Sequence, residues 1–499
     1  MSRVLGAALL GVEGVPVEVE VRISSQLPRL DVVGLPEAAV RESGARVRAA
    51  IGAIGARFPD RRITVNLAPA ELRKAGAGLD LPIAVAILAA CGALAEESLE
   101  GIALLGELAL DARLRPVRGA LALVLAARGA GCRRAIVPGP NGAEAALAPG
   151  IEVLAAADLA AVVRHLTLGE ALPRARAAPA AARSAGPDLR DVRGQERAKR
   201  ALEIAAAGGH GVLLCGAPGS GKTMLARRVP GLLPSLGLEE ALEVVRIHGA
   251  AGTRSDGAPL PAERPFRSPH HTASTAGLLG GGSPPRPGEV SLAHRGVLFL
   301  DELPEFGRRT LEALRQVLEE RRVVIARARG SCAFPAHFQL VAAANPCPCG
   351  WRGSGQRDCR CDEGAVARYG ARLSGPLLDR IDLHVEVRPV RFADLDRAAA
   401  GPGSAAARER VAEAQRLQQR RGAFRNADLP DDAVDAAAAA TPDARRLLGR
   451  SVERLGLSAR AARRVLKVAR SIADLAGAAR IGPEAMAEAV GFRAGLHPP

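Results

Sequence analysis

The sequence predicts an α/β protein with more than one domain, and two observations carry this prediction. A short apolar run at 211–215 is followed by a glycine-rich loop and then by a segment with helical character, as in a parallel sheet. Near the start of the chain, 17–21 and 62–67 alternate like half-buried strands, and 81–94 has the composition of a buried helix. The 499 residues are enough for about three domains.

Charge and composition narrow the class of partner and the compartment. The formal net charge of +15 favours a polyanion such as nucleic acid, although a solvated surface or a compositional bias toward Ala and Arg would give the same excess. We expect no contact with a membrane, because no apolar run approaches about 18 residues without charge or proline. The N-terminus lacks a secretory pattern, so we expect a cytoplasmic protein with reduced thiols.

The glycine-rich loop has the pattern G-x-x-x-x-G-K-[ST] in the strand–loop–helix context that phosphate binding requires. Backbone N–H groups of the loop and the helix N-terminus would surround the phosphates. We expect Lys222 to reach the β- and γ-phosphates and Thr223 to hold Mg²⁺. The predicted nucleotide-binding residues are Gly216, Ala217, Pro218, Gly219, Ser220, Gly221, Lys222, Thr223 and Met224.

A second motif lies downstream, where the apolar strand 296–300 ends in two acidic residues. Asp301 would hold Mg²⁺ through water, and Glu302 would polarise the attacking water. Together the two motifs predict hydrolysis of a nucleotide, with ATP and Mg²⁺ as the cofactors.

Four of the eight cysteines cluster as two C-x-C pairs, Cys347 with Cys349 and Cys359 with Cys361. Four thiolates in two close pairs can surround one tetrahedral ion, so we favour a structural Zn²⁺ that staples a glycine-rich loop. The spacing is tighter than the common C-x-x-C, and four free thiols are the alternative.

Motifs at 31–36, 65–70 and 80–84 resemble the N-terminal domain of the Mg-chelatase-like ATPases called YifB or ComM, a domain similar in fold to the proteolytic domain of Lon. The segment 106–119 resembles the part of Lon that ends in the catalytic lysine. Here no lysine follows, and no serine stands near Leu79. A Ser–Lys dyad needs both groups, so the resemblance implies a non-proteolytic domain.

The segments 188–195, 264–274 and 374–382 resemble the AAA+ core of the same family. The resemblance implies that Asn345 is the sensor-1 amide, which orients the attacking water. It also implies that Arg380 is the arginine finger, which reaches a neighbouring subunit's nucleotide. Arg460 would lie nearest the nucleotide on the sensor-2 helix, which Ser458 caps. The weaker candidates are Arg372 for the finger and Arg463 and Arg464 for sensor 2.

Two other features leave alternatives open. His270 and His271 are adjacent, and we expect neighbouring side chains to point apart, which favours a structural or pore-facing role over a metal site. The strands 321–330 and 334–342 form a hairpin whose arginines, Arg327 and Arg329, contact DNA phosphates or are simply solvated.

These motifs divide the chain into a Lon-like domain (1–168), a linker (169–187), an AAA+ core with the cysteine insertion (188–390) and a helical lid (391–499), in which 409–421 is a solvent-facing helix. The resemblance implies a homo-hexamer with ATP between subunits. We prefer a DNA helicase that drives branch migration in natural transformation and recombination. The alternative is a motor that remodels a protein complex, as the chelatase motor subunit does.

Overall fold

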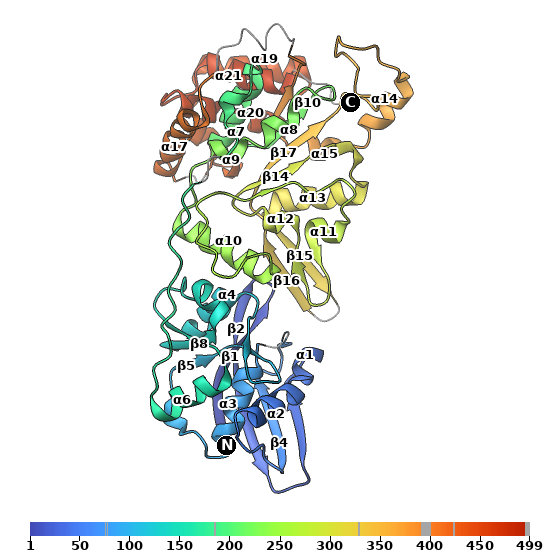
Figure 1. Cartoon of the computed structure of the whole chain (residues 1–499). Coiled ribbons are helices and arrows are strands. Elements are labelled where there is room, and N and C mark those ends of the chain that lie inside the picture. Colours follow the sequence, from blue (N-terminus) through green and yellow to red (C-terminus); the bar gives the residue numbers. More distant parts are fainter. Residues whose placement is uncertain are drawn as a thin grey trace.

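The computed structural model describes residues 1–74, 76, 78–183, 186–327, 330–390, 401–422 and 425–494. An N-terminal α/β unit lies at one end of the molecule, a second α/β unit lies in the middle, and a helical region covers the other end (Figure 1).

The N-terminal unit is a seven-stranded sheet in the order β3-β4-β2-β1-β5-β8-β9. Its strands are β1 (Ser2–Leu10), β2 (Glu13–Ser24), β3 (Arg29–Val33), β4 (Arg62–Ala68), β5 (Ile102–Leu104), β8 (Arg134–Pro138) and β9 (Glu152–Ala156), and a small ribbon is made by β6 (Glu107–Leu108) and β7 (Leu114–Arg115). Its helices are α1 (Ala38–Arg41), α2 (Ser43–Ala53), α3 (Asp80–Ala90), α4 (Ala120–Gly129), α5 (Gly142–Ala145) and α6 (Leu159–Leu168). The expected strands at 17–21 and 62–67 lie within β2 and β4. The expected helix at 81–94 ends earlier, at Ala90.

The second unit is a five-stranded parallel sheet in the order β11-β14-β17-β10-β18. Its strands are β10 (Val212–Cys215), β11 (Phe266–Arg267), β14 (Val297–Leu300), β17 (Gln339–Ala344) and β18 (Leu383–Glu386). The predicted apolar runs form β10 and β14, which are buried along their whole length. Because β10, β14 and β17 are parallel neighbours, the loops that follow them meet at one edge of the sheet. We call this the carboxyl edge and the other the amino edge.

Helices surround this second sheet on both faces (Figure 1). The helices of this second unit are α7 (Glu196–Gly208), α8 (Lys222–Ala226), α9 (Val229–Leu232), α10 (Leu238–Ala251), α11 (Thr275–Leu279), α12 (Glu289–Leu292), α13 (Arg308–Glu320), α14 (Glu363–Gly370) and α15 (Gly375–Leu378), with a small ribbon of β12 (Gly280–Gly281) and β13 (Arg286–Pro287).

The expected hairpin exists, but its second strand differs from the prediction. The strand β15 (Arg322–Arg327) pairs with β16 (Gly330–Pro335), and the residues further on belong to β17 in the main sheet. Pro335 has no N–H to continue the ladder, so the chain leaves the hairpin there. Arg329 lies outside the described residues, as does the side chain of Arg327.

The helical region consists of α17 (Ser404–Arg420), α18 (Val434–Ala438), α19 (Pro442–Leu455), α20 (Ala459–Leu475) and α21 (Pro483–Ala494). Ser458 caps α20 as expected, since its hydroxyl accepts a hydrogen bond from the Ala461 N–H at 3.1 Å. The expected solvent-facing helix at 409–421 is present as the second half of α17, but only one of its faces is exposed. Val411 and Ala414 of α17 are fully buried in the apolar cluster that also contains α7.

The two α/β units share apolar surface. Val12, at the turn between β1 and β2, is buried in a cluster with Phe334 of β16. Leu242 and Val245 of α10 belong to a cluster with residues of α4. In the described ranges, no helix combines the length and the apolar character needed to cross a membrane.

Candidate functional site

The phosphate loop connects β10 to α8 at the carboxyl edge. Gly219 and Gly221 have φ angles of +75° and +97°, which side-chain-bearing residues adopt only with strain. Two glycines therefore let the loop curl back so that its backbone N–H groups face one space. Met224, on the first turn of α8, is 38% exposed beside this loop.

Lys222 lies inside the curl of the loop and is 8% exposed. Its Nζ donates hydrogen bonds to the carbonyls of Gly216 at 2.7 Å and Ala217 at 3.0 Å, and to Asn345 Oδ1 at 3.1 Å. Burial lowers the pKa of Lys222 from its ordinary value. The structure thus brings the loop lysine and the amide at the end of β17 into direct contact.

Thr223 and Asp301 also meet at this edge. The Thr223 hydroxyl donates to Asp301 Oδ2 at 2.7 Å, and the Glu302 N–H donates to Asp301 Oδ1 at 3.0 Å. A hydroxyl and a carboxylate side by side are hard oxygen donors of the kind that Mg²⁺ takes. In the described part of the chain, the buried Ser220 hydroxyl of the loop has no hydrogen-bond partner. This donor set fits a nucleotide phosphate with Mg²⁺.

Glu302 follows directly, with a half-exposed side chain and a φ of +51°. Its Oε2 lies 3.0 Å from Nδ1 of His271, which belongs to the loop after β11. Sequence reasoning assigned the two histidines a structural or pore-facing role and missed this contact. The order of parallel strands could have suggested it, because β11 and β14 are neighbours whose ends share one edge.

The four clustered cysteines lie beside the phosphate loop. Their Sγ atoms all lie within 4.8 Å of one another, with Cys347 3.4 Å from Cys349 and 3.6 Å from Cys359. Sulfurs at the corners of a tetrahedral Zn²⁺ site are about 3.8 Å apart, so the spacing fits that ion. Backbone N–H groups, first that of Trp351, lower the pKa of Cys349 to about 6, whereas the pKa values of Cys359 and Cys361 are raised, with hydrogen bonds from and charge on neighbouring thiols among the causes. The spacing of the sulfurs is therefore the observation that supports the metal site.

The cysteine loop also packs on the phosphate loop. A Cβ added to Gly350 would lie 2.6 Å from Cδ of Pro218, so the two loops touch there. Cys347 itself comes two residues after Asn345 and is fully buried. A metal bound by these cysteines would therefore stiffen the residues that would surround the phosphates.

Arg380 lies at the amino edge, just before β18. Its side chain is 3% exposed, it forms an ion pair with Glu319 of α13, and within the described residues its Nε and Nη1 have no hydrogen-bond partner. Burial, and then the nearby Arg460 and Arg464, lower the pKa of Arg380 to about 10. The weaker finger candidate, Arg372, instead pairs with Glu305 at 2.7 Å, three residues after Glu302.

Arg460 lies at the same amino edge, where its Nη2 is 3.6 Å from Glu319 Oε1. This differs from the expectation that Arg460 lies nearest the nucleotide of its own chain. The helical region packs on the amino edge, so the length of the sheet separates Arg460 from the phosphate loop, about 13 Å for the four residues of β10. The competing Arg464 lies there too, with Nη1 2.5 Å from Asp382 Oδ1.

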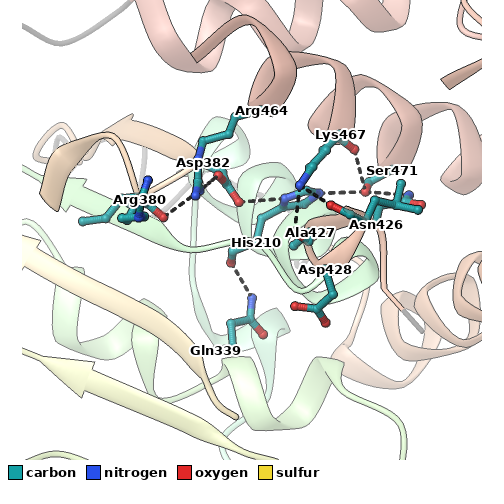
Figure 2. A network of polar contacts seen from close by, with 12 residues as sticks. His210, Gln339, Arg380, Asp382, Asn426, Ala427, Asp428, Arg464, Lys467 and Ser471 are labelled. Carbon is teal, nitrogen blue, oxygen red and sulfur yellow. Dashed lines mark hydrogen bonds and ion pairs between the residues drawn. The ribbon is translucent and has the colours of Figure 1, made fainter. Parts of the chain in front are cut away.

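A buried polar network joins the amino edge to α20 (Figure 2). His210 is its centre. Nδ1 of His210 bonds to Asp382 Oδ2 at 2.9 Å, Nε2 lies 2.8 Å from the Ser471 hydroxyl, and the carbonyl accepts from Gln339 at 3.0 Å. Arg464 completes it by donating to Asp382 and to the carbonyl of Arg380. The backbone that carries Arg380 is thus fixed to the helical region.

In the N-terminal unit, the position where the Lon resemblance would place a nucleophile is occupied by a structural group. Asp80 is fully buried, and its Oδ2 accepts a hydrogen bond from Arg46 Nε at 2.6 Å. A carboxylate held in this way is a packed ion pair rather than a nucleophile open to substrate.

Comparisons with known proteins agree with the motifs. Residues 188–395 match the family "Magnesium chelatase, subunit ChlI", residues 19–141 match "Subunit ChlI of Mg-chelatase", and residues 401–493 match "Magnesium chelatase, subunit ChlI C-terminal".

Relatives match over nearly the whole chain. The uncharacterized protein YifB of Salmonella typhimurium is 47% identical over 98% of this chain and 96% of its own length. An uncharacterized protein of Mycobacterium tuberculosis is 45% identical over 99% of this chain and 98% of its own length. The competence protein ComM of Haemophilus influenzae is 43% identical over 99% of this chain and 97% of its own length. By these matches, the chain belongs to the YifB/ComM family of Mg-chelatase-like AAA+ proteins.

Proposed function

We propose that this protein hydrolyses ATP at the carboxyl edge of its parallel sheet. The observation that carries the proposal is the contact of Lys222 with Asn345, beside that of Thr223 with Asp301. Lys222 would exchange its carbonyl partners for phosphate oxygens, and Thr223 with Asp301 would hold Mg²⁺. The ion, when bound, neutralises charge on the phosphates. Glu302 would accept the proton of the attacking water, and Asn345 would orient that water.

We further propose a homo-hexameric ring in which the amino edge of one subunit faces the phosphate loop of the next. Arg380 lies at the edge opposite its own phosphate loop, which is where a finger for another subunit belongs. Its guanidinium is buried against Glu319, so it would leave that ion pair to reach the neighbour's nucleotide. Arg460 lies beside it, so its proposed contact is with the neighbour's nucleotide rather than its own. Hydrolysis would then be coupled to motion between subunits.

For the client of this motor we propose DNA, and for the activity a helicase that drives branch migration in natural transformation and recombination. Two observations support the proposal: the net charge of +15 and the relative named as a competence protein. The proposed place of action is the cytoplasm. The second candidate is remodelling of a protein complex, which the matches to magnesium chelatase subunit families favour.

The test is the ATPase rate with and without single-stranded and forked DNA, with Glu302→Gln as the blank. We expect hydrolysis that DNA stimulates, that the variant abolishes, and that comes with DNA affinity falling steeply as salt rises. Robust hydrolysis with no response to DNA and no DNA binding at moderate salt would contradict the DNA motor and favour a protein client. No hydrolysis at all would contradict the enzyme itself.

A further inference from the structure

Glu302 needs an external support to act as a general base. It stands in the connection between β14 and α13, its side chain is 49% exposed, and its backbone φ is +51°. A long carboxylate with this exposure has several rotamers available, and only some of them point toward a bound phosphate. Correct orientation of the base toward the reacting water is worth a large factor in rate.

His271 provides such a support from a different part of the chain. Its Nδ1 lies 3.0 Å from Glu302 Oε2, and its side chain is 30% exposed. The contact is an ion pair by distance and not an aligned hydrogen bond; because a general base must be ionised, a hydrogen on Nδ1 is what attracts the carboxylate oxygen. The contact leaves the second carboxylate oxygen of Glu302 to accept a hydrogen bond from water.

The loop that carries His271 is fastened on both sides. Before it, Arg267 donates to both carboxylate oxygens of Glu289 at 2.7 and 2.8 Å. After it, the Thr275 hydroxyl lies 2.8 Å from the Thr310 hydroxyl of α13, the helix that follows Glu302. His271 is thus held in a fixed place relative to the same connection that carries Glu302.

We propose that His271 is a positioning residue for ATP hydrolysis, which holds the Glu302 carboxylate in the rotamer that receives the proton of the attacking water. This inference rests on the proposed ATPase function and adds to it a residue that acts through the base without touching the nucleotide. It predicts that loss of the imidazole lowers the rate of the chemical step and leaves nucleotide binding unchanged.

The chain offers a matched control in the adjacent histidine. His270 is exposed, and its Nδ1 lies 2.8 Å from the Thr272 hydroxyl, within its own loop. Its ring centroid is 4.1 Å from that of His271, so both substitutions disturb the same ring contact. Only the substitution of His271 also removes the contact with Glu302.

The experiment compares His271→Ala and His270→Ala in the full chain by steady-state ATPase kinetics, by affinity for a fluorescent ATP analogue and by Tm. We expect His271→Ala to lower kcat about tenfold, as for loss of one polar contact that orients a charged group, with the affinity and Tm near wild type. We expect His270→Ala to keep kcat within about twofold.

Two conservative variants separate positioning from packing. Asn places its amide N–H near the site of Nδ1, whereas Gln places its own near Nε2. We expect His271→Asn to recover kcat to within about threefold of wild type and His271→Gln to recover little. If the alanine variant does not fold, the difference in kcat between His271→Asn and His271→Gln still tests whether His271 positions Glu302.

An unchanged or raised kcat in His271→Ala would overturn the inference, as would equal losses in the two alanine variants. Equal rescue by Asn and Gln would also overturn it. Failure of the proposed function looks different, because then the wild-type chain itself would hydrolyse no ATP.

Discussion

The two edges of the second sheet treat polar groups in opposite ways. At the carboxyl edge, Lys222 satisfies itself with backbone carbonyls of its own loop, and the Ser220 hydroxyl has no partner among the described residues. At the amino edge, His210, Asp382 and Arg464 form a buried network whose members bind one another and the helical region (Figure 2). The polar groups at the carboxyl edge can exchange their present hydrogen-bond partners for those of a ligand. The groups in the network at the amino edge bind one another and resist such exchange.

The difference shows that one sheet can use one edge to bind the phosphates and the other edge to hold the helical region. Contacts to loop carbonyls are readily replaced by phosphate oxygens, while a buried network costs several kcal/mol to break. Arg380 is the exception at the amino edge, because two of its nitrogens have no partner in the described chain although its backbone carbonyl is bound by Arg464. It therefore resembles Ser220 in having buried polar atoms without a partner, and in the proposed ring the two edges would face each other between subunits.

The largest expected effect comes from two variants, each with one edge inactivated, that are measured alone and then mixed. We expect Lys222→Ala and Arg380→Ala each to lower the ATPase rate at least about a hundredfold. In a random equimolar mixture that is allowed to exchange subunits, about a quarter of the interfaces would join an intact loop to an intact arginine. Mixing should therefore restore a comparable fraction of the activity, measured by the steady-state rate.

Arg372→Ala is the control for this mixing experiment. Arg372 is half-exposed and pairs with Glu305, so its loss should change the rate little. No recovery on mixing Lys222→Ala with Arg380→Ala would mean that Arg380 serves only the fold of its own chain, and the two edges would then not form a shared site.

The same change of charge should have different effects on stability at the two edges. Asp382→Asn weakens the bonds that hold Arg464 and His210, so we expect a loss of about 3 kcal/mol and a Tm lower by roughly 5 °C or more. Asp301→Asn keeps an acceptor for the Thr223 hydroxyl, and it should leave Tm within about 2 °C of wild type. Thermal unfolding followed by circular dichroism measures both, and equal shifts would contradict the comparison.

Acid should remove the stabilisation that the ionised Asp382 carboxylate gives to the folded chain. Burial opposes ionisation, but Arg464 and His210 outweigh it and hold the pKa of Asp382 below its ordinary value. The unfolded chain takes up a proton at Asp382 near pH 4 while the folded chain does not, so the stabilisation is present above that pH and is lost as the pH falls through the lower folded pKa. The gap in Tm between wild type and Asp382→Asn should therefore narrow below about pH 4. A constant gap would show that the charge of Asp382 is not its cause.

The smallest effect concerns the cysteine loop at the carboxyl edge, for which we propose a structural Zn²⁺. Elemental analysis of the purified protein should find about one zinc per chain, absent in Cys359→Ser and retained in Cys91→Ser, whose thiol is exposed and outside the cluster. Because Gly350 touches Pro218, loss of the ion should also weaken ATP binding, by about two- to threefold. Zinc-free wild-type protein with full affinity would leave four thiols as the better description.

Local patterns were enough to predict the carboxyl edge. The phosphate loop and the strand before Asp301 each have a signature of a few residues, the family resemblance indicated Asn345, and parallel pairing brings the three together. The cysteine cluster was found in the same way, since its ligands lie within one short loop. In each case the functional residues lie within a few positions of the strand or loop that holds them.

The amino edge could not be predicted so well, because its contacts join residues far apart in the chain. His210 meets Ser471 across 261 positions, and the place of Arg460 depends on how the helical region packs. The contact of His271 with Glu302 has the same origin, in the order of strands rather than in any local motif. Periodicity likewise missed the burial of α17, whose many charges conceal the small residues that face α7.

The shared apolar surface between the two α/β units has a practical consequence for dissection of the chain. The segment expected to be a linker, 169–187, would be the place to divide the chain, but Leu242 and Val245 of α10 pack with residues of α4 from the other side of it. A fragment that begins after this segment would expose these side chains, together with the surface that covers Val12. Such a fragment should self-associate or precipitate, so replacement of the exposed leucine and valine by polar residues belongs in its design.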